Sequence, residues 1–313
     1  MTTLEPHTTS DDLIATLKGL HATPRTWPTW LLYDARGSQL FEDITRLDDY
    51  YPTRTEMGIL DAHAAEMARA IGSNVELVEL GAGSSDKVDR LLATGAVTRY
   101  IPVDVSPWAL EQSIERVTTR FPNIESIALE ANYVERVELP NSDGATRVAF
   151  FPGSTIGNFH PSEACAFLRR IATAIGPGQE LLIGTDMRKD PAILTAAYND
   201  QLGITAAFNM NLLVRANREW GTDFDLDKWK HLAHFNPLKS RIEMHLFSLA
   251  EQTVHVGGEA FAFEFGESIW TESSYKFTPK SILQMAKDSG FVVERHWSDP
   301  MDWFRVTLMR VRA

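Results

Sequence analysis

A glycine-rich turn is the first place in this chain where residue types and their spacing could bind a ligand. The segment ELGAG, residues 79–83, follows a short β-rich run and precedes a stretch with helical spacing. Glycines in such a turn let backbone N–H groups approach a ligand closely, and the start of a helix favours polar or negative groups. Asp104 ends the next strand-like run, where a carboxylate can accept hydrogen bonds from ribose hydroxyls. These residues predict a site for a nucleotide-type cofactor.

The charges at the turn narrow the class of cofactor. Asp86 stands where a dinucleotide fingerprint has its third glycine, and both Asp86 and Glu79 would repel a pyrophosphate. A cofactor that carries cations suits this acidic entrance better, and S-adenosylmethionine (SAM) has a sulfonium and an ammonium. We therefore expect SAM. The residues alone leave open a nicotinamide-dependent oxidoreductase, and also a tight turn in which Asp104 is only a solvated strand end.

Strand-like and helix-like segments alternate around this turn. The strand-like runs lie at 75–80, 99–106, 124–133, 146–159 and 180–187. Such alternation is typical of βαβ units and a parallel sheet, and therefore of an α/β fold. After Met187 it stops: 189–235 has mainly helical patterns and 240–277 has alternating, antiparallel-type strands. A helix closed by Gly290 and two final strands then resume the first pattern, so we expect a sheet domain that is interrupted by an insertion.

Composition and charge exclude several classes of protein. The chain has 313 residues, which suits two domains, and a net charge of −12, which disfavours nucleic acids and anionic membranes as partners. Cys165 is the single cysteine, so no intrachain disulfide forms, and a reducing, cytoplasmic location is expected. No apolar run approaches the roughly 20 residues of a membrane span, and the polar, acidic start is no signal peptide. The nine histidines show no metal-type spacing such as HExxH, so no metal is expected.

Longer motifs then identify a family resemblance that covers nearly the whole chain from about residue 28. In order along the chain they are WLLYDARGSQLFEDITRL, YYPTRTE, ELGAGSSDK, FFPGSTIGN, TAAYND with LGITAAFN, RIEM and ESSYKF. Together they resemble the SAM-dependent histidine Nα-methyltransferases of ergothioneine biosynthesis, a family with fungal relatives that act on other aromatic amino acids.

The resemblance implies a fold and an activity. It implies a Rossmann-like class I methyltransferase domain at 54–188 and 278–313, and an α+β substrate-binding domain at 1–53 and 189–277 that closes over the amino acid. The implied reaction transfers three methyl groups from SAM to the α-amino group of L-histidine. Its products are S-adenosylhomocysteine and hercynine, the betaine of histidine, in the first step of ergothioneine biosynthesis.

The motif match also implies contacts with the cofactor. They fall on Gly81, Lys87, Asp104, Asn132 and Tyr133, and Lys87 would meet the carboxylate of the methionyl end. The family has Asp where this chain has Asn132. An amide can both accept from and donate to an adenine edge, so adenine binding survives this departure.

The substrate contacts that the resemblance implies are more numerous. They are Tyr33, Phe41, Tyr50, Gly153, Thr155, Asn158, Tyr198, Met244, Glu272 and Ser274. Asn158 and Tyr198 would hold the carboxylate of the amino acid, and Tyr50 would meet its amine. Tyr33 and Phe41 would form pocket walls.

The remaining positions concern the reacting nitrogen and the ring. Gly153 and Thr155 would form a turn beside the nitrogen, and Met244 would pack against the ring. Glu272 and Ser274 would contact the imidazole, and their i, i+2 spacing on an expected strand turns both to one face.

The implied mechanism is an in-line displacement that needs alignment and a neutral amine. An α-amine with a pKa near 8 is partly neutral at pH 7, so no residue is assigned as a general base. Another aromatic amino acid, such as tryptophan or a derivative, stays an alternative substrate because an indole N–H could also donate to Glu272. A binding protein without catalysis is the alternative from another class. We expect a monomer whose partner is a small molecule.

Overall fold

Each of the two units into which the chain divides is built from segments far apart in the sequence. The computed structural model describes residues 9–83 and 86–313. Unit 1 contains Pro52–Arg188 and Lys276–Ala313, and unit 2 contains residues 9–51 and Lys189–Tyr275. The boundaries expected from the sequence fall at 53/54, 188/189 and 277/278. The first eight residues, and the pair Ser84 and Ser85 of the expected helix cap, lie outside the described residues.

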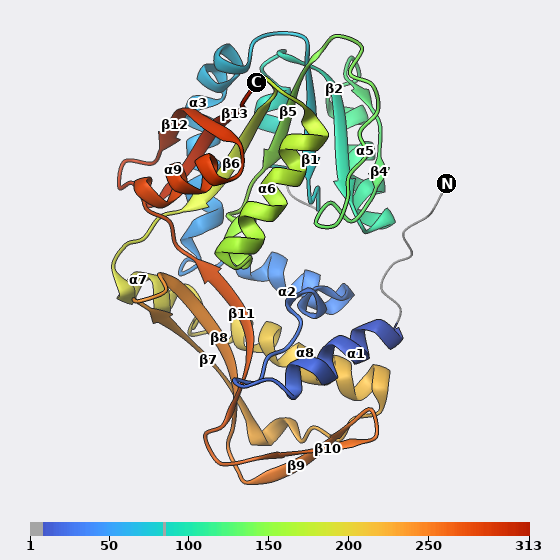
Figure 1. Ribbon diagram of the computed structural model, residues 1–313, viewed down its shortest axis with the longest axis vertical. Coiled ribbons are helices and arrows are strands. Elements are labelled where there is room, and N and C mark those ends of the chain that lie inside the picture. The colour runs from blue at the N-terminus through green and yellow to red at the C-terminus, as the bar shows by residue number, and fades with distance from the viewer. Residues whose placement is uncertain (1–8, 84–85) are drawn as a thin grey trace. The chain divides into compact units, whose positions relative to one another are not determined.

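Unit 1 is organised around an eight-stranded sheet (Figure 1). Seven strands form a continuous path in the order β12-β13-β6-β5-β1-β2-β3, and β4 also pairs with β2. The strands β1 to β6 run parallel where they pair, whereas β13 is antiparallel to both β6 and β12. Their bounds are β1 Val75–Leu80, β2 Val97–Asp104, β3 Glu125–Ser126, β4 Leu129–Glu130, β5 Thr146–Phe151, β6 Glu180–Asp186, β12 Phe291–Ser298 and β13 Phe304–Val311.

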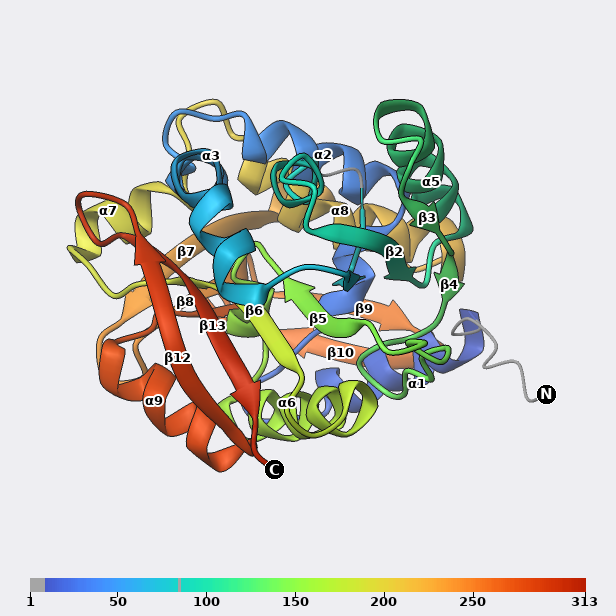
Figure 2. The ribbon, with the colours of Figure 1, turned by 90° about the horizontal axis from the view of Figure 1, so that it is seen from above.

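Helices cover both faces of this sheet, which explains its apolar strands. Figure 2 shows α6 and α9 on one face and α3 and α5 on the other. All six residues of β1 are buried, because a parallel sheet between two helix layers exposes neither side. The helices are α3 Tyr51–Ile71, α4 Asp89–Leu92, α5 Pro107–Arg120, α6 Pro161–Ile175 and α9 Pro279–Asp288, with a short 3-10 helix, η2, at Thr155–Asn158.

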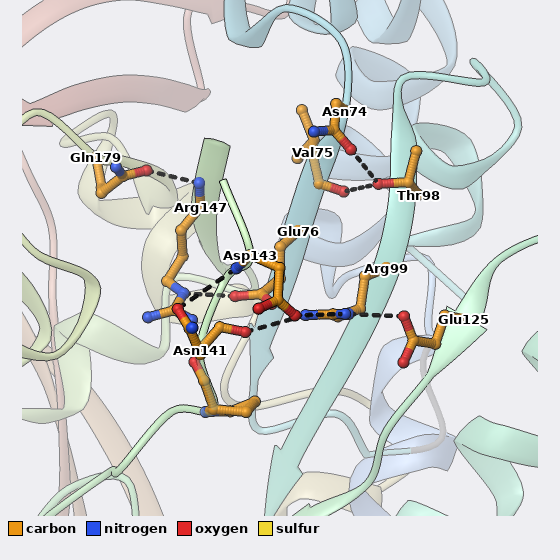
Figure 3. Close-up of polar contacts among 11 residues, drawn as sticks. Asn74, Val75, Glu76, Thr98, Arg99, Glu125, Asn141, Asp143, Arg147 and Gln179 are labelled. Atoms are coloured by element: carbon orange, nitrogen blue, oxygen red, sulfur yellow. Dashed lines mark hydrogen bonds and ion pairs between the residues drawn. The ribbon is translucent and has the colours of Figure 1, made fainter. Parts of the chain in front are cut away.

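A polar network closes the amino end of β1 (Figure 3). Glu76 is fully buried and accepts from Arg147 Nε at 2.5 Å and from Arg99 Nη1 at 3.1 Å. Arg99 also reaches Glu125 at 2.8 Å and Asp143 at 3.3 Å. A buried carboxylate is tolerated only when paired and hydrogen-bonded, so this network ties β1, β2, β3 and β5 together at the end of the sheet opposite the glycine turn.

Unit 2 combines helices with antiparallel strands. Strands β11, β8 and β7 form one sheet in that order, and β10 pairs with β9 in a separate hairpin. The elements are α1 Thr9–Leu20, η1 Thr29–Tyr33, α2 Ala35–Thr45, α7 Pro191–Ala196, α8 Ile204–Trp220, η3 Leu226–Lys228, β7 Trp229–Asn236, β8 Arg241–Ser248, β9 Gln252–Val256, β10 Glu259–Phe263 and β11 Ser268–Tyr275. Helix α8 packs on β7 and β8.

Three expectations about local structure are wrong. The predicted helical region 189–235 ends in strand β7, whose alternating burial from Trp229 to Ala233 follows the period of a half-buried strand. The predicted third strand, 124–133, forms only the two-residue segments β3 and β4, which pair with β2 alone at the edge of the sheet. The helix expected after the glycine turn contains only Asp89–Leu92, and Gly95 follows with a φ of 77°.

Among the described residues, no helix has the length and apolarity that crossing a bilayer requires.

Candidate active site

The glycine turn after β1 has the backbone shape that its sequence predicts. Gly81 and Gly83 have φ angles of 74° and 44°, in the left-handed region that favours glycine. A Cβ at Gly81 would also lie 2.8 Å from the hydroxyl oxygen of Tyr133. Gly81 N donates to Val103 O at 2.8 Å, which fixes the turn against β2. Both the conformation and the space therefore require glycine at position 81.

Asp104 lies at the end of β2, against this turn. One of its carboxylate oxygens accepts from Gly83 N at 3.3 Å, and the other accepts from Ser106 N at 2.9 Å. The carboxylate is therefore held in place by the backbone and stays partly exposed. This is the position that a ribose-binding acid takes in nucleotide-binding sheets.

Asn132 and Tyr133 follow β4 at the same end of the sheet. The Asn132 side chain accepts from Val134 N at 3.2 Å, so part of its hydrogen-bonding capacity shapes its own turn. Tyr133 packs edge-on to Phe151 and Phe167, with ring centroids 6.1 and 6.2 Å away. Burial raises the pKa of Tyr133 well above its usual value, so its hydroxyl stays neutral.

Glu79 is a fully buried acid at the carboxyl end of β1. Tyr100 OH donates to its Oε2 at 2.5 Å, and its Oε1 has no hydrogen-bond partner among the described residues. Burial raises the pKa of Glu79 to about 8, although the Tyr100 hydrogen bond opposes the change. The carboxyl group is therefore mainly protonated at neutral pH.

Glu56 on α3 was assigned no role from the sequence, although it ends the YYPTRTE motif. It is fully buried, its Oε2 accepts from Lys87 Nζ at 2.7 Å, and both of its oxygens accept from Gly153 N at 2.9–3.0 Å. Lys87, expected to meet the cofactor's carboxylate, is thus held by a carboxylate of the chain itself. Contact of Lys87 with the cofactor's carboxylate stays a prediction.

The turn after β5 contains three of the expected substrate contacts. Gly153 has a φ of 80° and Ser154 a φ of 56°, and Ser154 Oγ accepts from Asp186 N at 2.9 Å. Thr155 donates to Pro152 O at 3.1 Å. Asn158, expected to hold the substrate's carboxylate, lies in η2 and is partly exposed.

A second buried ion pair supports this end of the sheet. Asp186 ends β6, and its carboxylate lies 2.8 Å from Lys276 Nζ, with both side chains almost fully buried. The backbone joins the same segments, because Phe277 N donates to Asp186 O at 2.8 Å. The sequence alone indicated neither this pair nor the Glu56–Lys87 pair.

In unit 2, five aromatic rings form a connected group. Tyr33 lies edge-on to Phe41 and Phe208 at 5.7 and 5.6 Å, and Phe41 lies 6.4 Å from Tyr50. Tyr50 lies edge-on to Tyr198 at 6.0 Å. The structure thus brings together four residues expected to contact substrate. Phe208, on α8, is a buried member of the group that the sequence did not single out.

The acid expected to bind the imidazole is buried beside this group. Glu272 is 7% exposed, and it pairs across the sheet with Met244 of β8. Ser274, two residues further along β11, lies on the same face and accepts from Tyr198 OH at 2.8 Å. Carboxylate, thioether, hydroxyl and aromatic groups therefore meet on one face of β11 and β8.

His231 positions Tyr198. Asn209 Nδ2 lies 2.9 Å from His231 Nδ1, and His231 Nε2 lies 2.9 Å from Tyr198 O. Because an amide nitrogen only donates and a carbonyl only accepts, Nδ1 is the acceptor and the proton is on Nε2. Burial lowers the pKa of His231, which keeps this neutral form at neutral pH.

Comparison with known proteins identifies the family. The family model described as "Histidine-specific methyltransferase, SAM-dependent" matches residues 11–311. The chain belongs to this family. It is 39% identical over 297 residues to the histidine N-alpha-methyltransferase of Mycolicibacterium smegmatis, a match that covers 93% of this chain and 92% of that protein.

A second relative supports the family assignment, and a solved structure supports the fold. The chain is 32% identical over 283 residues to "Ergothioneine biosynthesis protein 1" of Neurospora crassa, covering 88% of this chain and 32% of that protein. The solved structure of the mitomycin 7-O-methyltransferase MmcR has a TM-score of 0.50 and 15% identity, and it covers 97% of this chain and 67% of that one. The structural match supports the class I methyltransferase fold alone.

As a member of this SAM-dependent family, the chain is a methyltransferase, and the residues at the glycine turn fit its cofactor. Gly81 and Gly83 form an open left-handed turn after β1, and Asp104 beside it presents a fixed carboxylate of the kind that ribose hydroxyls use. The family that the chain belongs to is SAM-dependent, so the nicotinamide alternative is wrong.

Proposed function

We propose that this methyltransferase transfers three methyl groups to the α-amino group of L-histidine and so produces hercynine. The single observation that carries the choice of substrate is the buried carboxylate of Glu272, paired with Met244 and two residues from Ser274. Membership of the histidine-specific family and the similarity to an ergothioneine biosynthesis protein support the same reaction.

Ring recognition depends on the residues of β11 and β8. The carboxylate of Glu272 would accept the imidazole N–H, the hydroxyl of Ser274 would bond to the other ring nitrogen, and Met244 would pack against the ring. Only 7% of Glu272 is exposed, so its carboxylate is largely shielded from water before a substrate binds. A bound imidazole would donate a hydrogen bond to this buried carboxylate. An indole N–H could use the same carboxylate but would leave Ser274 without a second ring nitrogen, which favours histidine over tryptophan.

Binding of the other end of the amino acid relies on neutral donors and aromatic faces. Asn158 and Tyr198 each offer a neutral hydrogen-bond donor, and a neutral donor can bind a carboxylate without adding a fixed cation near the product's ammonium. Tyr33, Phe41 and Tyr50 present ring faces and edges, and contact of a methylated ammonium with a ring face is worth about 0.5–2 kcal/mol. This environment tolerates a cation that becomes larger and more apolar with each transfer.

Chemistry at the amine requires alignment more than it requires a base. When bound, SAM supplies an electrophilic methyl group. The chain's residues orient the amine, and a neighbouring positive charge lowers the amine's pKa from about 8, which increases the neutral fraction. Holding the two reacting atoms in line accounts for several kcal/mol of the barrier, so no side chain is assigned to remove the proton.

The test replaces Glu272 with alanine and with glutamine. A hydrogen bond to a charged group contributes about 1.5–3 kcal/mol, so we expect kcat/KM for histidine to fall about 10–150-fold in E272A. The S273A variant is the control, because Ser273 lies on the same strand and faces the other side. Mass spectrometry of products 14, 28 and 42 Da heavier than histidine provides the rates, and binding of S-adenosylhomocysteine checks the fold. Unchanged histidine kinetics in E272A would contradict the assignment.

A further inference from the structure

Three potential metal ligands meet on the sheet of unit 2, away from Glu272 and Ser274. His234 on β7 pairs directly with Glu243 on β8, and His245 lies two residues further along β8 on the same face. One ligand atom from each side chain falls within 4.8 Å of the other two. Met244, between Glu243 and His245, points to the opposite face with Glu272. The cluster is therefore distinct from the proposed ring-binding residues.

The spacing of the ligand atoms approaches that of a tetrahedral ion. Zinc bonds to histidine and carboxylate are about 2.0–2.2 Å long, so tetrahedral ligand atoms lie roughly 3.4 Å apart. His234 Nε2 lies 3.3 Å from Glu243 Oε2, and His245 Nε2 lies 3.7 Å from the same oxygen. Two of the three separations are thus close to the required value. The rings of His234 and His245 are stacked, with centroids 5.2 Å apart and planes at 20°, so the third separation closes only when the half-exposed His234 ring rotates out of this stack.

Neighbouring groups leave the required atoms available. His245 Nδ1 lies 3.1 Å from Ser268 Oγ, so the other ring nitrogen, Nε2, faces the cluster. That nitrogen is buried and has no hydrogen-bond partner among the described residues. Glu243 Oε1 accepts from Arg241 Nε at 2.6 Å and from Asn236 Nδ2 at 3.0 Å, which leaves Oε2 toward the histidines. Metal ligands are oriented by this kind of outer hydrogen bond.

The charges near the cluster decide which ions it can take and how tightly. Arg241 balances the charge of Glu243, so affinity should be weaker than in a closed structural zinc site. Mg²⁺ and Ca²⁺ prefer ligand sets made of oxygen atoms, so a site with two imidazole nitrogens does not suit them.

We propose that His234, Glu243 and His245 bind one divalent transition-metal ion, preferably Zn²⁺, with water in the remaining position. Two histidines and one glutamate are an established ligand set for zinc, and the open side at His234 admits an exchangeable ion. The ion would join β7 to β8 across the sheet.

The experiment is isothermal titration of the full-length protein, carrying no histidine tag, with ZnCl₂ at pH 7.5. We expect one equivalent bound by the wild type, and binding at least tenfold weaker in H234A and in H245A. The control is H255A, because His255 is also exposed and also lies beside an acid, Asp223 at 2.8 Å, but within the described part of the chain it belongs to no group of three potential ligands. MgCl₂ should give no heat of binding.

A second measurement keeps the result independent of folding. His245 is largely buried, so H245A could lose stability, whereas the exposed H234A should keep the wild-type response to S-adenosylhomocysteine in thermal unfolding. Cobalt substitution gives a visible spectrum whose intensity separates a four-coordinate ion from a hydrated one. The proposal is wrong if the wild type binds no zinc, or if H234A binds it as tightly as H255A does.

Discussion

The buried pair of Glu56 and Lys87 provides the most direct test of how the cofactor end of unit 1 is held together. Replacing Glu56 with alanine leaves the Lys87 ammonium without this carboxylate, in a side chain that is only 10% exposed. It also removes the carboxylate that accepts from Gly153 N. Both losses occur inside the protein, where water cannot substitute for the missing acceptor.

The expected magnitude follows from this burial. Breaking a buried ion pair by removing one partner costs about 3–5 kcal/mol. For a unit of this size each kcal/mol lowers the unfolding temperature by roughly 2–4 °C, so E56A should unfold roughly 6–20 °C below the wild type. The assay is thermal unfolding of the cofactor-free protein, followed by tryptophan fluorescence. The control is D61A on the same helix, because Asp61 pairs with Arg90 at the surface, where such pairs contribute about 0–1 kcal/mol.

A double-mutant cycle decides whether the pair itself is responsible. K87M alone leaves Glu56 as a buried acid without its ammonium, whereas E56A/K87M removes both charges. The double variant should therefore lose clearly less stability than the sum of the two single variants, by about 1–3 kcal/mol. Additive losses, or an E56A protein that unfolds like D61A, would refute the reasoning.

Two further predictions concern Glu79 and Tyr50. The folded protein keeps Glu79 protonated to about pH 8, whereas the unfolded chain releases this proton near pH 4.5, so the stability that this group contributes is present below pH 4.5 and is lost as the pH rises to 8. We therefore expect the free energy of unfolding of E79Q, measured in urea without cofactor, to rise relative to that of the wild type by on the order of 4 kcal/mol between pH 5 and pH 8. A difference between the two proteins that stays constant over this pH range would contradict the raised pKa. If the Tyr50 ring face supports the methylated amine, Y50A should lower kcat/KM for histidine more than Y50F does. Equal losses in the two variants would assign the role to the hydroxyl.

Local patterns were sufficient for the features that depend on neighbouring residues. The run VELVEL is buried along its whole length as β1, and the glycines that follow it adopt positive φ angles. The i, i+2 spacing of Glu272 and Ser274 places both on one face because side chains alternate along a strand. These features follow from short-range geometry, which the sequence carries directly.

Features that depend on distant partners could not be derived in the same way. Glu56 meets Lys87 and Gly153, which are 31 and 97 positions away, and no local period indicates either contact. His234, Glu243 and His245 converge only because a strand pair brings them together, so their spacing matched no linear metal motif. Strand β7 was missed because its short alternation ends a segment, 189–235, whose longer pattern is helical.

Strand β1 contains two acids three positions apart, and their surroundings differ in a way that has a consequence for ligand uptake. Glu76 faces two guanidinium groups supplied by the chain, whereas Glu79 faces a phenol and keeps its proton. A positively charged ligand bound near Glu79 would lower the pKa of this acid, and the proton would be released to the solvent. Binding of such a ligand would then release protons to the buffer and would be tighter at higher pH. The pH of the solution would therefore control how readily ligand binding, the first step of the catalytic cycle, occurs.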